Sequence, residues 1–99
     1  MSVESSLDEG VLYIMVSGRF EFSVHPHFRD LTGLAENGVK QIVIDLAKTD
    51  YMDSSALAML LVLRDKFVGD KNAIQINNAQ NDIKEILEMA NFTQLFKMG

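Results

Sequence analysis

Two hydroxyls and a carboxylate stand side by side in this 99-residue chain, as Asp53, Ser54 and Ser55 of the stretch "YMDSSAL" at 51–57. Such residues cap helices, because a side-chain oxygen accepts an otherwise unpaired backbone N–H and contributes roughly 1 kcal/mol. A hydroxyl at a helix N-terminus is also accessible to a partner enzyme, and a phosphate there meets free N–H groups and the positive end of the helix dipole. The junction therefore predicts a helix cap, a phosphorylation site, or both.

Two other groups of side chains could suggest metal or acid–base chemistry. The stretch "HPH" at 25–27 places two imidazoles around a proline, a poor relative geometry for one ion, and the chain has no cysteine and no third histidine. Asp45, Asp50 and Asp53 could suggest a carboxylate cluster for Mg²⁺, but no Gly-rich phosphate loop accompanies them. We expect solvated histidines, Asp50 in a turn, and neither a metal nor a cofactor.

The composition limits the kind of protein this can be and the kinds of partner it can bind. Ninety-nine residues, 47% of them apolar, make one domain spanning 1–99. The net charge is -5 and the nine Lys and Arg residues are scattered, whereas nucleic-acid binding depends on neutralising phosphates with basic side chains. The longest apolar run, 56–63, is far shorter than the roughly 20 residues needed to cross a bilayer. Residues 1–10 lack a basic n-region. We expect a cytoplasmic protein, with no nucleic-acid partner and no membrane insertion.

The first third of the chain predicts two strands and a helix. Residues 3–7 alternate weakly and 11–16 are rich in β-formers, with turn residues between them, so they predict an antiparallel hairpin whose second strand ends at Gly18. Apolar residues then fall on one helical face between 23 and 38. Ser23 is the expected N-cap of this helix.

The remaining elements complete an α/β pattern. The nearly wholly apolar run 41–46 predicts an inner strand covered on both faces. A helix over 54–68, a short strand over 72–77 and a helix around 83–90 follow, with a final turn or short strand over 92–96. The order β-β-α-β-α-β-α implies parallel neighbours. We therefore predict a single α/β domain with a mixed sheet of four to five strands and three or four helices.

The stretch "QIVIDLAKTDYMDSSALAMLLVLRDKF" resembles the segment that defines STAS domains, shared by bacterial anti-sigma-factor antagonists. In that family a buried strand and a short loop lead to an apolar pair, and Asp-Ser-Ser/Thr-Gly-Leu-Gly then opens a helix. "SGRFEFS" resembles the family's Gly-x-Leu-Asp loop, with Glu21 in place of the Asp. "NDIKEILEMANFTQLFK" resembles its third helix and the segment after it. The chain departs from the pattern at Glu21, and also at Ala56 and Ala58, which replace two glycines.

The resemblance implies a phosphorylation-controlled binding module and no enzymatic activity. The unphosphorylated form would bind a serine-kinase anti-sigma factor or a related switch kinase, the kinase would phosphorylate Ser54, and a PP2C-type serine phosphatase would reset the switch. The alternative is a STAS scaffold subunit of a transporter or signalling complex that is never phosphorylated. The lost glycines, and a C-terminus shorter than is usual in the family, favour this alternative. The residues expected to contact the partner are Glu21, Asp53, Ser55, Ala56 and Met59.

Overall fold

An antiparallel hairpin opens the chain, as predicted. In the computed structural model, which describes residues 2–35, 38–67 and 73–99, strand β1 (Ser2–Asp8) pairs along its whole length with β2 (Val11–Phe20). The turn between them places Glu9 and Gly10 at positive φ, 50° and 84°. Gly10 adopts this conformation without steric cost because it lacks a Cβ.

Strand β2 is longer than the sequence predicted. Gly18 does not end it: the strand continues to Phe20, and Gly18 has a φ of 82° beside a shift in register between Gly18 and Arg19. From Gly18 to Phe20, across this irregularity, β2 pairs in parallel with β4 (Thr49–Met52), a strand that the sequence did not predict. The Thr49 hydroxyl, which is buried, donates a 2.7 Å hydrogen bond to the carbonyl of Val16 and ties the two strands together.

The main sheet runs in the order β1-β2-β3-β5-β6, with β4 beside β2. Strands β3 (Gln41–Asp45), β5 (Ile74–Asn77) and β6 (Lys97–Met98) are parallel to their neighbours. The mixed α/β sheet is thus confirmed, with six strands because the short β4 and β6 join it. The helices of the described residues are α1 (His25–Ala35), α2 (Ser54–Lys66) and α3 (Asn81–Met89), and the 3₁₀ turns include η1 (Phe22–Val24) and η3 (Phe92–Gln94).

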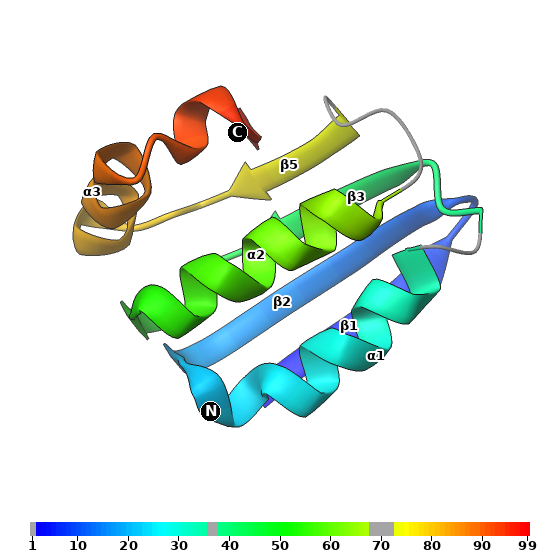
Figure 1. Ribbon diagram of the computed structural model, residues 1–99, viewed down its shortest axis with the longest axis horizontal. Coiled ribbons are helices and arrows are strands. Elements are labelled where there is room, and N and C mark those ends of the chain that lie inside the picture. Colours follow the sequence, from blue (N-terminus) through cyan, green and yellow to red (C-terminus); the bar gives the residue numbers. More distant parts are fainter. Residues whose placement is uncertain (1, 36–37, 68–72) are drawn as a thin grey trace.

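Helices α1 and α2 lie side by side over the same face of the sheet and run in the same direction (Figure 1). This follows from the strand order, because the two crossovers step the same way across the sheet and such crossovers are right-handed. The predicted cap at Ser23 is wrong: that residue lies inside η1, and α1 begins at His25. Residue 68, the predicted last residue of the second helix, lies outside the described residues.

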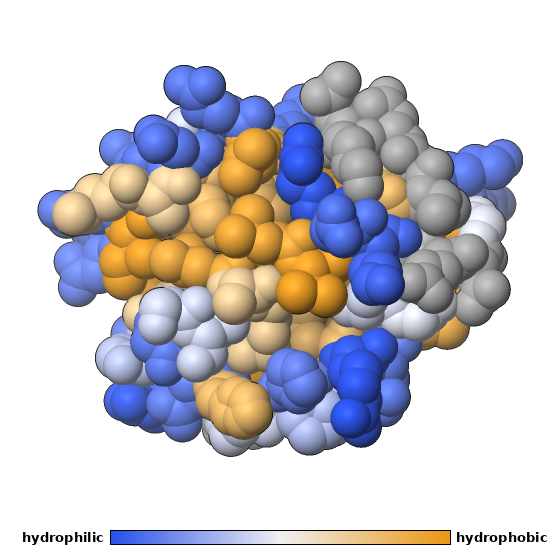
Figure 2. Space-filling model, viewed as in Figure 1, coloured by the Kyte–Doolittle hydropathy of each residue, from blue (hydrophilic) through white to orange (hydrophobic). Residues whose placement is uncertain are grey.

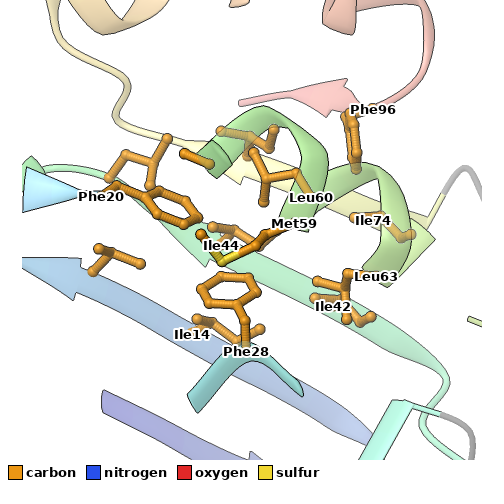
Figure 3. Packing of buried hydrophobic residues seen from close by; sticks show 14 of the residues in the cluster. Ile14, Phe20, Phe28, Ile42, Ile44, Met59, Leu60, Leu63, Ile74 and Phe96 are labelled. Atoms are coloured by element: carbon orange, nitrogen blue, oxygen red, sulfur yellow. The ribbon is translucent and has the colours of Figure 1, made fainter. Parts of the chain in front are cut away.

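The core fills the space between these helices and the sheet. Ile14, Ile42 and Ile74, from three adjacent strands, are buried together with Leu60 and Leu63 of α2 (Figure 3). Each of these side chains removes enough apolar surface from water to contribute roughly 1.5–3 kcal/mol to folding. The position of α2 on the sheet is therefore fixed by one apolar side of the helix.

Strand β3 is an inner strand, but it is not covered on both faces. Ile42 and Ile44 are fully buried, whereas Gln41, Val43 and Asp45 alternate with them and are only half-buried. The prediction of two covered faces was wrong because α1 and α2 both pack on one face (Figure 1). None of the described helices has the length and apolar character needed to cross a membrane.

Candidate functional site

Helix α2 begins at Ser54, one residue after the side chain that caps it. Asp53 is in an extended conformation, and its carboxylate accepts a 3.2 Å hydrogen bond from the backbone N–H of Ala56. Ser54 is exposed, and within the described part of the chain its hydroxyl has no hydrogen-bond partner. Asp53 therefore carries the cap, and the Ser54 hydroxyl is accessible at the positive end of a 13-residue helix.

Glu21 and Asp53 leave the sheet at the same end. Phe20 of β2 is aligned with Met52 of β4 in a parallel pair. Glu21 and Asp53 are the residues that directly follow these two strands. Both carboxylate side chains are half-buried. Both residues were expected to contact the same partner, and the register of β2 and β4 brings them to the same end of the sheet.

Arg19 adds a cation to this end of the sheet. Its Nε lies 3.1 Å from an oxygen of Glu21, and its guanidinium lies 3.9 Å from the centre of the Tyr51 ring. Arg19 is exposed, and exposed ion pairs typically contribute at most about 1 kcal/mol to stability. The pair therefore contributes little to folding, and it places a cation beside the Glu21 carboxylate. Sequence reasoning did not identify Arg19 or Tyr51, which become neighbours only through the pairing of β2 with β4.

Two of the expected contact residues face inward. Ala56 is 0% exposed and offers no side-chain surface to a partner, so its predicted contact is wrong. Met59 is 6% exposed, and Figure 3 shows it pointing toward the rings of Phe20 and Phe28, whose centres are 5.0 Å apart. The inward side of α2 passes through both residues, because positions three and four apart share a helical face. Ser55 is half-buried.

His25 and Asp45 make local contacts, and Asp50 lies in β4 and not in the predicted turn. His25 and His27 are exposed, and the His25 ring stacks on Phe22 at 5.3 Å. Asp45 accepts hydrogen bonds from the backbone N–H of Ala47 at 2.9 Å and from the side-chain amide of Asn78 at 3.2 Å. Within residues 2–35, 38–67 and 73–99, no group of three His, Cys, Asp or Glu side chains is placed to hold a metal ion.

A groove between α1 and α2 is the feature that sequence reasoning missed. It has a volume of about 530 Å³ and begins beside the start of α2, at Phe22 and Ser55. Phe22 is 61% exposed and Val62, further along the groove, is 51% exposed. Figure 2 shows an apolar surface over this part of the molecule. The available signal was the run 56–63, which is apolar all round the helix although only one side of a helix can face the sheet. The described residues that line it are Phe22, His25, Phe28, Arg29, Thr32, Gly33, Ser55, Ala58, Met59, Val62 and Lys66.

The chain matches a known domain family over nearly its whole length. Residues 2–97 match the family described as "Mlab, STAS domain". A STAS-domain containing protein of Pseudomonas aeruginosa (strain UCBPP-PA14) is 41% identical over 94 residues, which cover 95% of this chain and 93% of that protein.

Solved structures share the fold at low sequence identity. An anti-sigma factor antagonist from Mycobacterium paratuberculosis superposes with a TM-score of 0.83 at 17% identity, over 98% of this chain and 83% of that one. The Bacillus cell fate determinant SpoIIAA in its phosphorylated form gives 0.76 at 12% identity, over 99% and 91%. A sulfate transporter family protein from Wolinella succinogenes gives 0.74 at 14% identity, over 90% and 73%. At these identities the similarity is one of fold.

Proposed function

Because this chain belongs to the STAS domain family, we propose that it is a phosphorylation-controlled binding module that antagonises an anti-sigma factor. Its unphosphorylated form binds a serine-kinase anti-sigma factor, or a related switch kinase, in the cytoplasm. The kinase transfers the γ-phosphoryl group of ATP to the Ser54 hydroxyl and the complex dissociates. A PP2C-type serine phosphatase hydrolyses the phosphoserine and restores binding. STAS domains are generally binding domains without catalytic activity, and we propose none for this chain.

The observation that carries this proposal is that Asp53, and not Ser54, caps helix α2, so the Ser54 hydroxyl is not used by the described part of the fold. Asp53 makes the capping hydrogen bond to Ala56, while Ser54 is exposed at the first position of α2. A kinase can therefore reach the Ser54 oxygen without disrupting the cap. Two fold relatives support the same role: the anti-sigma factor antagonist from Mycobacterium paratuberculosis, and the cell fate determinant SpoIIAA in its phosphorylated form.

Phosphorylation of Ser54 would switch binding through charge alone. A phosphoserine adds about -1.5 to -2 charges at pH 7, here next to Asp53 and at the same end of the sheet as Glu21. The helix dipole stabilises a phosphate at this position by roughly 0.3–1 kcal/mol while it is exposed to water. Burying the dianion against a partner without a matching cation costs several kcal/mol. The free domain thus tolerates the phosphate, and the complex does not.

The contact surface that we propose surrounds Ser54. Glu21 and Asp53 contribute charge, Ser55 a hydroxyl at the helix start, and Met59 the small part of its side chain that reaches the surface. This surface excludes the Ala56 side chain, which is buried. Ala58 lies on the exposed side of the same helix, and its small side chain lets a partner backbone approach closely.

Substitutions at Ser54 test the switch. Ser54→Ala should fold, because Asp53 holds the cap, and should bind the kinase even in the presence of ATP. Ser54→Asp should fold and bind at least tenfold more weakly, since its carboxylate meets the same desolvation cost as the phosphate. Ser55→Ala is the matched control and should still become phosphorylated. The measurement is calorimetric titration with the purified kinase, with mass spectrometry after incubation with ATP.

The second candidate function is an unphosphorylated scaffold subunit of a transporter or signalling complex. The fold relative from the sulfate transporter family favours it, as does the replacement of the family glycines by Ala56 and Ala58. Equal kinase binding by the wild type, Ser54→Ala and Ser54→Asp, with no added phosphate, would leave this function in place of the switch.

A further inference from the structure

We propose that the groove between α1 and α2 binds an amphipathic helix of a partner protein, with carboxylate side chains of that helix facing Arg29 and Lys66. The inference deepens the proposed function and rests on it for the existence of a protein partner. It assigns that partner an apolar face and carboxylate side chains beside it, which the Ser54 surface alone does not require.

The shape of the groove suits a helix. Its two walls are the sides of α1 and α2, which run in the same direction (Figure 1). The lining residues of α2 recur at helical spacing, from Ser55 through Met59 and Val62 to Lys66. The groove is therefore elongated along the helix axes, and from residue 55 to residue 66 it extends about 16 Å at 1.5 Å per residue. An amphipathic helix enters such a groove with apolar side chains three and four positions apart.

Helix α2 has an apolar side that the fold does not cover. Its buried side packs on the sheet, yet Leu61 and Val62 are 41% and 51% exposed. Figure 2 shows an apolar surface in the middle of the face that carries α2. A helix that is apolar on all sides is normally buried on all sides, and exposed apolar surface flanked by polar residues marks interaction sites. A partner on the groove side would complete the burial of Val62.

The charge of the groove selects the partner. The chain has a net charge of -5, but none of the described lining residues is an Asp or Glu, while Arg29, Lys66 and His25 are among them. Arg29 and Lys66 are exposed, and neither forms an ion pair with another residue in the described part of the chain. Two cations without an ion-pair partner among the described residues, in an acidic protein, provide a site for carboxylates. The partner helix is therefore acidic where it meets them.

Gly33 is a second observation that favours close approach of a partner helix to α1. It lies within α1 and lines the groove. A glycine inside a helix lowers stability relative to alanine, and a Cβ built at Gly33 would meet no atom within 4 Å. The packing of the free domain therefore does not require the missing side chain. A partner helix lying against α1 does benefit from it.

The test uses two synthetic 16-residue helical peptides, both acetylated and amidated, with leucines at helical spacing. One carries two Glu residues beside the leucine face and the other carries two Lys residues at the same positions. Titrated into the full ¹⁵N-labelled chain, the Glu peptide should bind at least tenfold more tightly and shift amide signals at Ala58, Val62 and Gly33. Val62→Ser should weaken it at least fivefold. Arg29→Glu combined with Lys66→Glu should reverse the preference between the peptides.

Two further variants separate binding from folding. Gly33→Ala should raise the melting temperature yet weaken the Glu peptide at least threefold, which a purely structural role for Gly33 would not produce. Met89→Ser is the matched control, because Met89 is an exposed apolar side chain outside the groove, on α3. This variant should bind like the wild type.

Several outcomes would overturn the inference. These are no binding of either peptide, equal binding of both, or amide shifts confined to residues outside the groove. A dimer in light scattering that Val62→Asp converts to a monomer would show that a second copy of this chain occupies the groove instead. The peptide titration involves no kinase and no phosphate, so its failure leaves the Ser54 switch standing, and failure of the Ser54 experiment leaves the groove result intact.

Discussion

Helices α2 and α3 differ in how much apolar surface their packing leaves exposed. In α3, Ile83 and Leu87 are buried, the charged residues are exposed, and the exposed large apolar side chain is Met89 at the last position of the helix. In α2, Leu60 is buried in the core while its neighbours Leu61 and Val62 are largely exposed. A helix that only supports a fold needs one apolar stripe. The surplus apolar residues of α2 indicate that this helix serves an interaction as well.

The two helices also begin differently. Asp53 caps α2 with a side-chain hydrogen bond to Ala56. Gln80 precedes α3 and makes no side-chain cap bond, its amide donating instead to the carbonyl of Ala47. The helix with the side-chain cap, α2, is also the one whose first residue is the exposed Ser54. A firmly anchored helix N-terminus can hold a hydroxyl and later a phosphate in a fixed position.

The largest effect is expected on the buried side of α2. Leu60→Ala should lower the free energy of unfolding by about 2–5 kcal/mol, because Leu60 is fully buried and its truncation leaves a cavity. Urea unfolding followed by circular dichroism measures the change. Leu87→Ala in α3 is the matched variant, since Leu87 is buried to the same extent. A loss below 1 kcal/mol in Leu60→Ala would contradict the packing described for α2.

A smaller loss of unfolding free energy is expected from substitutions at the N-termini of α2 and α3, and it should differ between the two helices. Asp53→Ala should cost about 0.5–2 kcal/mol, because it removes the acceptor of the Ala56 N–H. Gln80→Ala should cost less than about 0.5 kcal/mol, since Gln80 is exposed and makes no cap bond. Both values come from the same denaturation experiment. Equal losses would mean that Asp53 has no special part in starting α2.

Much of this comparison could be anticipated from the sequence. The apolar runs at 11–16 and 41–46 indicated strands, and the "DSS" junction indicated a helix starting at Ser54. These features depend on residues close together in the chain, so local patterns capture them. The α/β class followed from the order of the elements, and the STAS resemblance agreed with it.

The features that sequence reasoning missed depend on pairing between distant segments. Strand β4 is only four residues long and exists because it pairs with the end of β2, from Gly18 onward. The inward orientation of Ala56 depends on which side of α2 meets the sheet, and the run 56–63 is too uniformly apolar to show this. The groove requires α1 and α2 to lie side by side, which local patterns do not determine.

The smallest effect is expected on the exposed side of α2, and it bears most directly on the comparison with α3. Leu61→Ser should change the free energy of unfolding by no more than about 0.5 kcal/mol, since Leu61 is 41% exposed and surface substitutions away from special features are usually within this range. Thermal and urea denaturation of this variant, with Leu60→Ala as the buried neighbour, provide the measurement. If Leu61→Ser cost as much as Leu60→Ala, the exposed side of α2 would be part of the fold after all. Its apolar residues would then need no partner, and α2 would be explained by packing.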